Sequence, residues 1–206
     1  MPWHGQAFDA FVARHGLPPM DMAMRERTDG KRNREIFAML FGRPLDEAEH
    51  AALEDEKEGM YRSLSRGRLE PLPGLLTLLD RIDARGIVAG VATSGPRANV
   101  EHTLGELGIG HRFAAIARGD QVERGKPAPD VFLHAARLLD VDPADCLAFE
   151  DAPLGVAAAV AAGMRCVAVT STYAADVFLA APTPPHAVYA DFEAWLDDAG
   201  RWMLAD

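Results

Sequence analysis

The sequence is poor in several features whose absence narrows the class of protein. Its 206 residues include only two cysteines, Cys146 and Cys166, and each lies in or beside a short apolar run. We predict small core residues in a reducing compartment rather than a disulfide. No apolar run approaches the roughly 18 residues of a membrane span, and the first residues lack the basic flank and apolar stretch of a signal peptide. We therefore predict a cytoplasmic protein with no membrane partner.

Positive charge is also scarce, because 21 Lys and Arg face 31 Asp and Glu, which gives a net charge of −10 at pH 7. No run of Lys and Arg is long enough to follow a phosphate backbone, so we predict no nucleic-acid partner. A few local cations remain sufficient for a small anionic substrate. With 49% hydrophobic and 25% charged residues, the chain has the composition of a packed domain of ordinary size, with or without a small insertion.

The first third of the chain has only helical patterns. Residues 6–17 place apolar side chains at helical spacing and end near Gly16. A second short helix is expected from Asn33, which we interpret as its N-cap, and a longer helix rich in acids follows Pro44. These patterns predict a small helical bundle over residues 1–68.

From Leu69 onward, short apolar runs alternate with amphipathic helical patterns. Such alternation predicts an α/β fold with a parallel sheet that is covered by helices on both faces. The expected strands are residues 87–95, 113–119, 146–151, 165–171 and 186–192. The expected helices are residues 73–86, 97–108, 129–141, 153–164 and a last one around Trp195.

Polar side chains follow three of these strands. The first strand ends at Thr93 and Ser94, the loop after the second carries Lys126, and the third ends at Glu150 and Asp151. In a parallel sheet these ends meet at one edge. Two carboxylates, an ammonium and hydroxyl donors suit Mg²⁺ and a phosphoryl group. Each feature alone also has an ordinary structural interpretation, as helix-starting acids, a solvated lysine or a turn.

Three segments carry a family resemblance: VATSGPRANVE, RGKPAPDVF and FEDAPLGVAAAVAAGM. They resemble the second, third and fourth motifs of the haloacid dehalogenase superfamily, and most closely its phosphatases and β-phosphoglucomutase-like enzymes. The resemblance implies a Rossmann-like core over residues 69–206 with a helical cap over residues 1–68. It also implies Mg²⁺-dependent hydrolysis of a small phosphate monoester, such as a sugar phosphate.

The same resemblance implies a role for each residue. Thr93 and the Ser94 backbone would bind the transferred phosphoryl group, and Lys126 would neutralise its charge. Asp151 would ligate Mg²⁺, with Glu150 as a second ligand or a partner through water. Family members usually have Ser where this chain has Ala152.

The family's first motif, an apolar strand ending in Asp-x-Asp-Gly, does not occur in the sequence. Its first Asp is the nucleophile and its second the general acid/base. Asp140 and Asp142 form the only Asp-x-Asp, and we predict a turn there. The N-terminal MPWHGQAFDAFVARHGL resembles the segment that follows the motif. We therefore expect a missing central strand between the strands that end at Thr93 and Glu150, and a nucleophile upstream of Met1. A phosphomutase and a catalytically inactive phosphate- or metabolite-binding protein remain open alternatives.

The cap segment TDGKRNREIF contains Lys31, Arg32 and Arg34, and it resembles a loop that faces the active site in relatives. These cations either recognise a second phosphate or sugar oxygens, or form a solvated basic turn. His4 matches a histidine near the cap hinge of β-phosphoglucomutase-like enzymes, where it approaches the substrate and the general acid/base. An inert terminal histidine is the alternative. The expected partner is a small phosphorylated metabolite, bound by a monomer or weak dimer.

Overall fold

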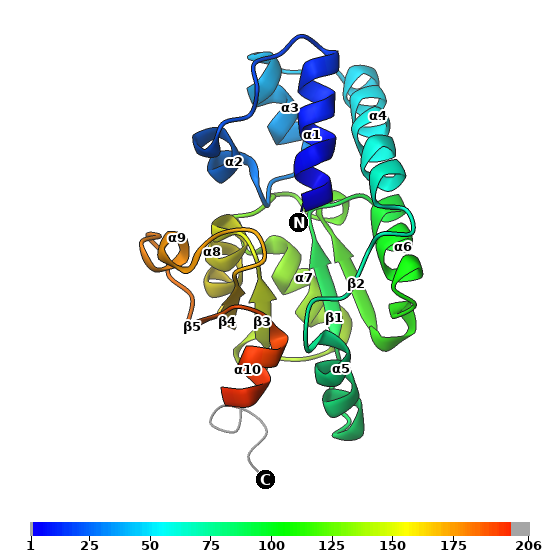
Figure 1. Cartoon of the computed structure of the whole chain (residues 1–206). Helices are drawn as coiled ribbons and strands as arrows, with labels where there is room; N and C mark the ends of the chain where they lie inside the picture. Colours follow the sequence, from blue (N-terminus) through cyan, green and yellow to red (C-terminus); the bar gives the residue numbers. More distant parts are fainter. Residues whose placement is uncertain (1, 199–206) are drawn as a thin grey trace.

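The computed structural model describes residues 2–198, and it consists of a helical layer above an α/β core (Figure 1). The helical layer contains α1 (Pro2–Arg14), α2 (Met22–Thr28), α3 (Asn33–Phe41) and α4 (Glu47–Ser65). Its apolar centre is formed by side chains from α1, the α1–α2 loop and α3: Phe8, Phe11, Val12, Met20, Ile36 and Phe37. The predicted helical bundle is therefore present, while the division at residue 68 stays a prediction.

Two details of the helical layer differ from the predictions. Asn33 is not an N-cap, because it is the first residue of α3 and its buried amide donates to Glu54 and Glu58. The short helix α2 was not predicted. Its N-cap is Asp21, whose side chain accepts from the Met24 N–H at 2.7 Å.

The core alternates helices and strands, as the sequence predicts. The helices are α5 (Leu75–Ala84), α6 (Arg97–Glu106), α7 (Asp130–Leu139), α8 (Pro153–Ala161), α9 (Ala175–Leu179) and α10 (Phe192–Asp198). The strands are β1 (Gly90–Thr93), β2 (Ala115–Arg118), β3 (Leu147–Glu150), β4 (Arg165–Val169) and β5 (Ala187–Tyr189). All strand pairs are parallel, which confirms the α/β class; the short helix α9 was not predicted.

The sheet is divided into two parts. β1 pairs with β2, and β3 pairs with β4, which pairs with β5. Within residues 2–198 no strand pairs with the inner edge of β1 or of β3. Because the family's first motif does not occur in the sequence, we expected a central strand to be missing between these two edges. The division of the sheet lies at the expected place.

Strand β1 is shorter than expected. Residues 87–95 were expected to be a buried strand, but only Gly90–Thr93 form β1. Ile87 and Val88 are 37% and 52% exposed. Both residues precede β1, so their side chains lie outside the part of the strand that pairs with β2.

Helices hold the two parts of the sheet together. On one face, α7 and α8 form a cluster with β2, β3 and β4 that includes Ala117, Val131 and Ala148. On the other face, Leu78 of α5 packs against Val167 of β4 and against α10. The Phe192 N–H donates to the Pro73 carbonyl at 3.1 Å, and a Cβ at Gly74 would overlap the backbone of Glu193.

Three smaller predictions also have an outcome. Cys146 and Cys166 are free, and Cys166 is buried in the core. Asp140 adopts φ 56° at the end of α7 and Asp142 caps a short 3₁₀ turn, so this Asp-x-Asp is a turn. No helix within residues 2–198 is long and apolar enough to cross a membrane. A cytoplasmic location stays a prediction.

Candidate active site

Lys126 and Glu150 form a buried ion pair at the end of β3. The Lys126 Nζ contacts the Glu150 carboxylate, and the two residues are 6% and 8% exposed. Burial raises the pKa of Glu150, and the neighbouring Lys126 charge opposes this rise. Gly155 leaves the necessary space, because a Cβ there would overlap the Glu150 carboxylate. From the sequence we assigned separate roles to these two residues, whereas the structure pairs them directly.

Asp151 is the more accessible carboxylate beside this pair. Its N–H donates to Glu150 Oε2 at 3.3 Å, and its Oδ2 accepts from Thr172 Oγ1 at 2.7 Å. Thr172 was missed by sequence reasoning, which considered only three strand ends. It lies shortly after β4, and the polar residues 170–172 that follow that strand were the available signal.

Thr93 and Ser94 lie at the end of β1. Thr93 Oγ1 accepts from the Gly95 N–H at 3.0 Å. The Ser94 hydroxyl donates to the carbonyl of Gly30 at 2.6 Å. The Ser94 side chain is therefore engaged with the cap, which leaves its backbone for a ligand.

The loop between α2 and α3, residues 29–32, lies directly over these strand ends. A Cβ built on Gly30 would be 3.5 Å from Leu154 Cβ and 3.7 Å from Ala152 Cβ at the start of α8. Arg32 Nη1 donates to the carbonyls of Val122 and Glu123 at 3.3 and 3.1 Å. The helical layer is thus docked onto the core at the edge that carries the polar residues (Figure 1).

The three predicted cap cations are placed differently from one another. Lys31 Nζ lies 3.7 Å from a Glu35 oxygen, and Arg32 Nε donates to Glu35 at 2.8 Å. Arg34 pairs instead with Glu47 in the first turn of α4, and both side chains are at least half exposed. The structure brings Lys31 and Arg32 to the cap–core boundary, whereas Arg34 lies apart from the strand ends. Substrate contacts of all three stay predictions.

A comparison with protein families is decisive for the class of protein. The model of the haloacid dehalogenase-like hydrolases matches residues 4–163. The chain belongs to this family.

Individual relatives of this haloacid dehalogenase-like hydrolase are sugar-phosphate enzymes and related proteins. Protein CbbY of Rhodobacter capsulatus is 38% identical over 82% of this chain and 79% of that protein. The fructose-1-phosphate phosphatase of Escherichia coli is 36% identical over 82% and 88%. The crystal structure of β-phosphoglucomutase from Clostridium difficile superposes with a TM-score of 0.79 at 25% identity, over 97% of this chain and 92% of that chain.

The residues present fit a Mg²⁺ ion only in part. Mg²⁺ binds through one or two carboxylates and otherwise keeps water and substrate phosphate. Asp151 offers an accessible carboxylate, but the Glu150 carboxylate is occupied by Lys126. Among residues 2–198, no three His, Cys, Asp or Glu side chains gather closely enough to hold a metal ion. Among the described residues, Asp151 is therefore the one accessible carboxylate that these strand ends offer to such an ion.

His4 belongs to a buried polar network in the cap that sequence reasoning largely missed. Its ring stacks on Tyr61 at 3.7 Å between centroids, and its Nδ1 lies 3.0 Å from Lys57 Nζ. Lys57 pairs with Glu58 at 2.8 Å, and Glu58 also accepts from the Asn99 amide of α6 at 2.5 Å. Lys57 and Glu58 lie in a run rich in acids, and from the sequence we expected their side chains to face the solvent.

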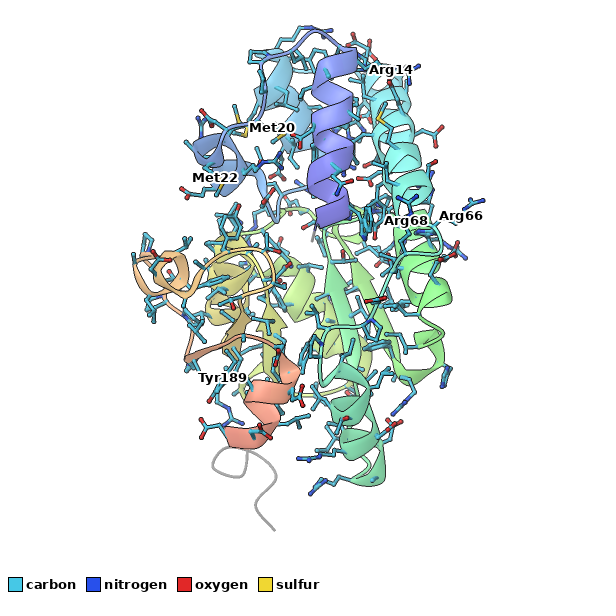
Figure 2. All side chains as sticks on the ribbon, in the orientation of Figure 1. Arg14, Met20, Met22, Arg66, Arg68 and Tyr189 are labelled. Carbon is cyan, nitrogen blue, oxygen red and sulfur yellow. The ribbon has the colours of Figure 1, made fainter. Side chains whose placement is uncertain are left out.

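The network continues as a row of side-chain contacts between α4 of the cap and α6 of the core. Tyr61 and Thr103 share a 2.8 Å hydrogen bond, and so do Ser65 and His102. Arg68 lies just beyond the end of α4 (Figure 2). Its guanidinium is 5.8 Å from the centre of the Trp3 ring at the start of α1. These contacts fix one side of the cap–core boundary, opposite the loop that covers the strand ends.

His4 makes stability depend on pH. Burial, assisted by the charge of Lys57, lowers the pKa of His4 from 6.5 to about 3. The unfolded chain therefore binds a proton between these values that the folded chain does not, so stability falls as pH decreases below about 6.5. Between about pH 7 and pH 5, the free energy of unfolding of the parent protein should fall by about 1–2 kcal/mol more than that of the His4→Asn variant. Urea unfolding at the two pH values measures this difference. Equal losses in both proteins would contradict this assignment.

Proposed function

We propose that the protein is a Mg²⁺-dependent phosphohydrolase that acts on a small phosphate monoester, such as a sugar phosphate. The observation that carries the proposal is the buried pair of Lys126 and Glu150 beside Asp151 at the end of β3. Thr93 ends β1 on the other side of the division in the sheet, where the family's nucleophile strand is expected. The kinship with a fructose-1-phosphate phosphatase supports the substrate class.

Each residue has a defined task in this proposal. The Thr93 hydroxyl and the Ser94 N–H bind phosphate oxygens, and the Lys126 ammonium balances the charge that develops on them. Asp151, oriented by Thr172, would hold Mg²⁺. Glu150, which is paired with Lys126, would act on the ion as a second ligand or through water. Bound Mg²⁺ supplies electrostatic stabilisation of the transferred phosphoryl group.

The nucleophile comes from a strand that residues 2–198 do not supply. The unpaired inner edges of β1 and β3 are parallel-strand edges of the kind that accept a further strand. A strand ending in Asp-x-Asp-Gly would place its carboxylates at the same edge as Thr93, Lys126 and Asp151. Those carboxylates would also complete the metal site.

The test compares the 206-residue chain with the same chain preceded by an apolar strand that ends in Asp-x-Asp-Gly. We expect the extended protein to release inorganic phosphate from hexose phosphates in the presence of Mg²⁺. Its rate should exceed that of a matched variant with the first Asp of the motif changed to Asn by about a thousandfold or more. EDTA should abolish the activity.

Three outcomes separate the proposal from its alternatives. Turnover by the 206-residue chain itself would show that the strand is not required. Turnover that depends on a bisphosphate activator, without net phosphate release, would identify a phosphomutase, which the likeness to β-phosphoglucomutase makes the nearest alternative. Phosphate binding without turnover in either chain would identify a binding protein. The proposed ligand remains a small phosphorylated metabolite, bound by a monomer or weak dimer.

A further inference from the structure

Two charged groups of α4 compete for the Nδ1 atom of His4. Lys57 Nζ lies 3.0 Å from Nδ1, and Glu58 Oε2 lies 3.9 Å from it. An ammonium group can only donate a hydrogen bond, whereas a carboxylate can only accept one. Contact with Lys57 therefore requires Nδ1 without a proton, and a direct contact with Glu58 would require Nδ1 with a proton.

The position of the Glu58 carboxylate is set by three hydrogen-bond donors. Its Oε1 accepts from Lys57 Nζ at 2.8 Å and from the Asn33 amide at 2.7 Å. Its Oε2 accepts from the Asn99 amide of α6 at 2.5 Å. Asn99 is 5% exposed, and its own carbonyl oxygen accepts from Arg62 at 3.0 Å, so both ends of this amide are fixed. Asn99 thus engages the carboxylate oxygen that would otherwise be available to the histidine.

His4 has one N–H at neutral pH. Burial, assisted by the charge of Lys57, lowers the pKa of His4 to about 3, so the ring is neutral. A neutral imidazole has a proton on only one nitrogen, and the contact with Lys57 leaves that proton on Nε2. The side chain is 28% exposed, and no residue in the described range 2–198 hydrogen-bonds to Nε2. This N–H is therefore available to water or to a ligand oxygen.

We infer that Asn99 is a positioning residue: it holds Glu58 away from His4 and thereby fixes His4 as the Nε2–H tautomer. The inference does not depend on the proposed phosphohydrolase function. His4 and Glu58 belong to the helical layer, whereas Asn99 belongs to α6 of the core. The contact between the two layers therefore sets the hydrogen-bonding character of His4. A helical layer docked on α6 presents an N–H donor at Nε2, and release from Asn99 would let Glu58 accept from Nδ1–H instead.

The test measures the tautomer of His4 by nitrogen nuclear magnetic resonance of the imidazole ring in the 206-residue chain at neutral pH. The signal of His4 is identified by its loss in His4→Asn. We expect the Nε2–H tautomer in the parent protein. In Asn99→Ala the ratio of Nε2–H to Nδ1–H should fall by about tenfold or more, because a hydrogen bond to the freed carboxylate favours Nδ1–H.

Asn99→Asp is a second variant for the case in which Asn99→Ala does not fold. It keeps the size of the side chain and an acceptor for Arg62, but it cannot donate to Glu58. Because only the donor to Glu58 is lost, the tautomer ratio of His4 should fall as it does in Asn99→Ala.

Ser65→Ala is the matched control for a general weakening of the contact between α4 and α6. Ser65 lies in the same row of contacts, and it hydrogen-bonds to His102 of α6 rather than to Asn99. The substitution should leave the tautomer of His4 unchanged. Nδ1–H in the parent protein, an unchanged ratio in the folded Asn99 variants, or an equal fall in Ser65→Ala would overturn the inference.

Discussion

Lys126→Ala is expected to lower the free energy of unfolding by about 3–5 kcal/mol. The substitution leaves the Glu150 carboxylate buried beside Gly155 without its positive partner. Glu150 is 8% exposed, so water cannot readily replace the lost ammonium. Urea unfolding at neutral pH measures the loss.

The pH dependence of this variant has a defined sign. Burial already raises the pKa of Glu150, and removal of Lys126 removes the charge that opposes that rise. A protonated Glu150 needs no positive partner, so the loss should be largest at high pH and smaller as pH falls through the raised pKa. The double variant Lys126→Met, Glu150→Gln should recover most of the lost stability. If the free energy of unfolding of Lys126→Ala lies within about 1 kcal/mol of the parent value, the ion pair does not contribute the expected stability.

Glu58→Ala is expected to cost a similar amount, about 3–5 kcal/mol. Glu58 is 3% exposed and accepts from Lys57, Asn33 and Asn99. Its removal leaves an ammonium that is 1% exposed without its carboxylate and the Asn99 amide without its acceptor, while the Asn33 amide keeps only Glu54. Because Asn99 belongs to α6, the loss also weakens the contact between cap and core. Chemical unfolding followed by circular dichroism measures the effect.

Asp55→Ala provides the comparison for Glu58. Asp55 is on the same helix, and its side chain is 89% exposed. We expect a change within about 0.5 kcal/mol for this substitution. If Glu58→Ala and Asp55→Ala lower the free energy of unfolding by the same small amount, the buried network does not stabilise the protein.

The order of helices and strands in the core was predictable because apolar periodicity and Gly or Pro boundaries are local signals. The contact of Lys126 with the acids that end β3 was predictable because parallel strands bring their ends together, whereas a shared site with Thr93 stays a prediction. The division of the sheet followed from a motif that does not occur in the sequence. These inferences required the sequence pattern and the topology of the fold, and no knowledge of individual contacts.

The errors concern residues whose role depends on tertiary contacts. Asparagine is a common N-cap residue, but the Asn33 amide donates hydrogen bonds to Glu54 and Glu58 of another helix. Lys57 and Glu58 look like solvated charges in an acidic helix, and only the packing of α1, α4 and α6 buries them. Arg34 lies two residues from Arg32 but pairs with Glu47 rather than with Glu35, a difference that the sequence does not indicate, and its predicted substrate contact stays a prediction. Sequence spacing alone does not resolve such choices.

The divided sheet also has a consequence for how the chain behaves in solution. Within residues 2–198, no strand pairs with the backbone donors and acceptors on the inner edges of β1 and β3, and Val88 is exposed beside one of these edges. Such edges are templates on which a second molecule can add a strand, and they promote aggregation. The solubility of the chain at high concentration should therefore be limited by these edges, and it should improve when a strand fills the space between them.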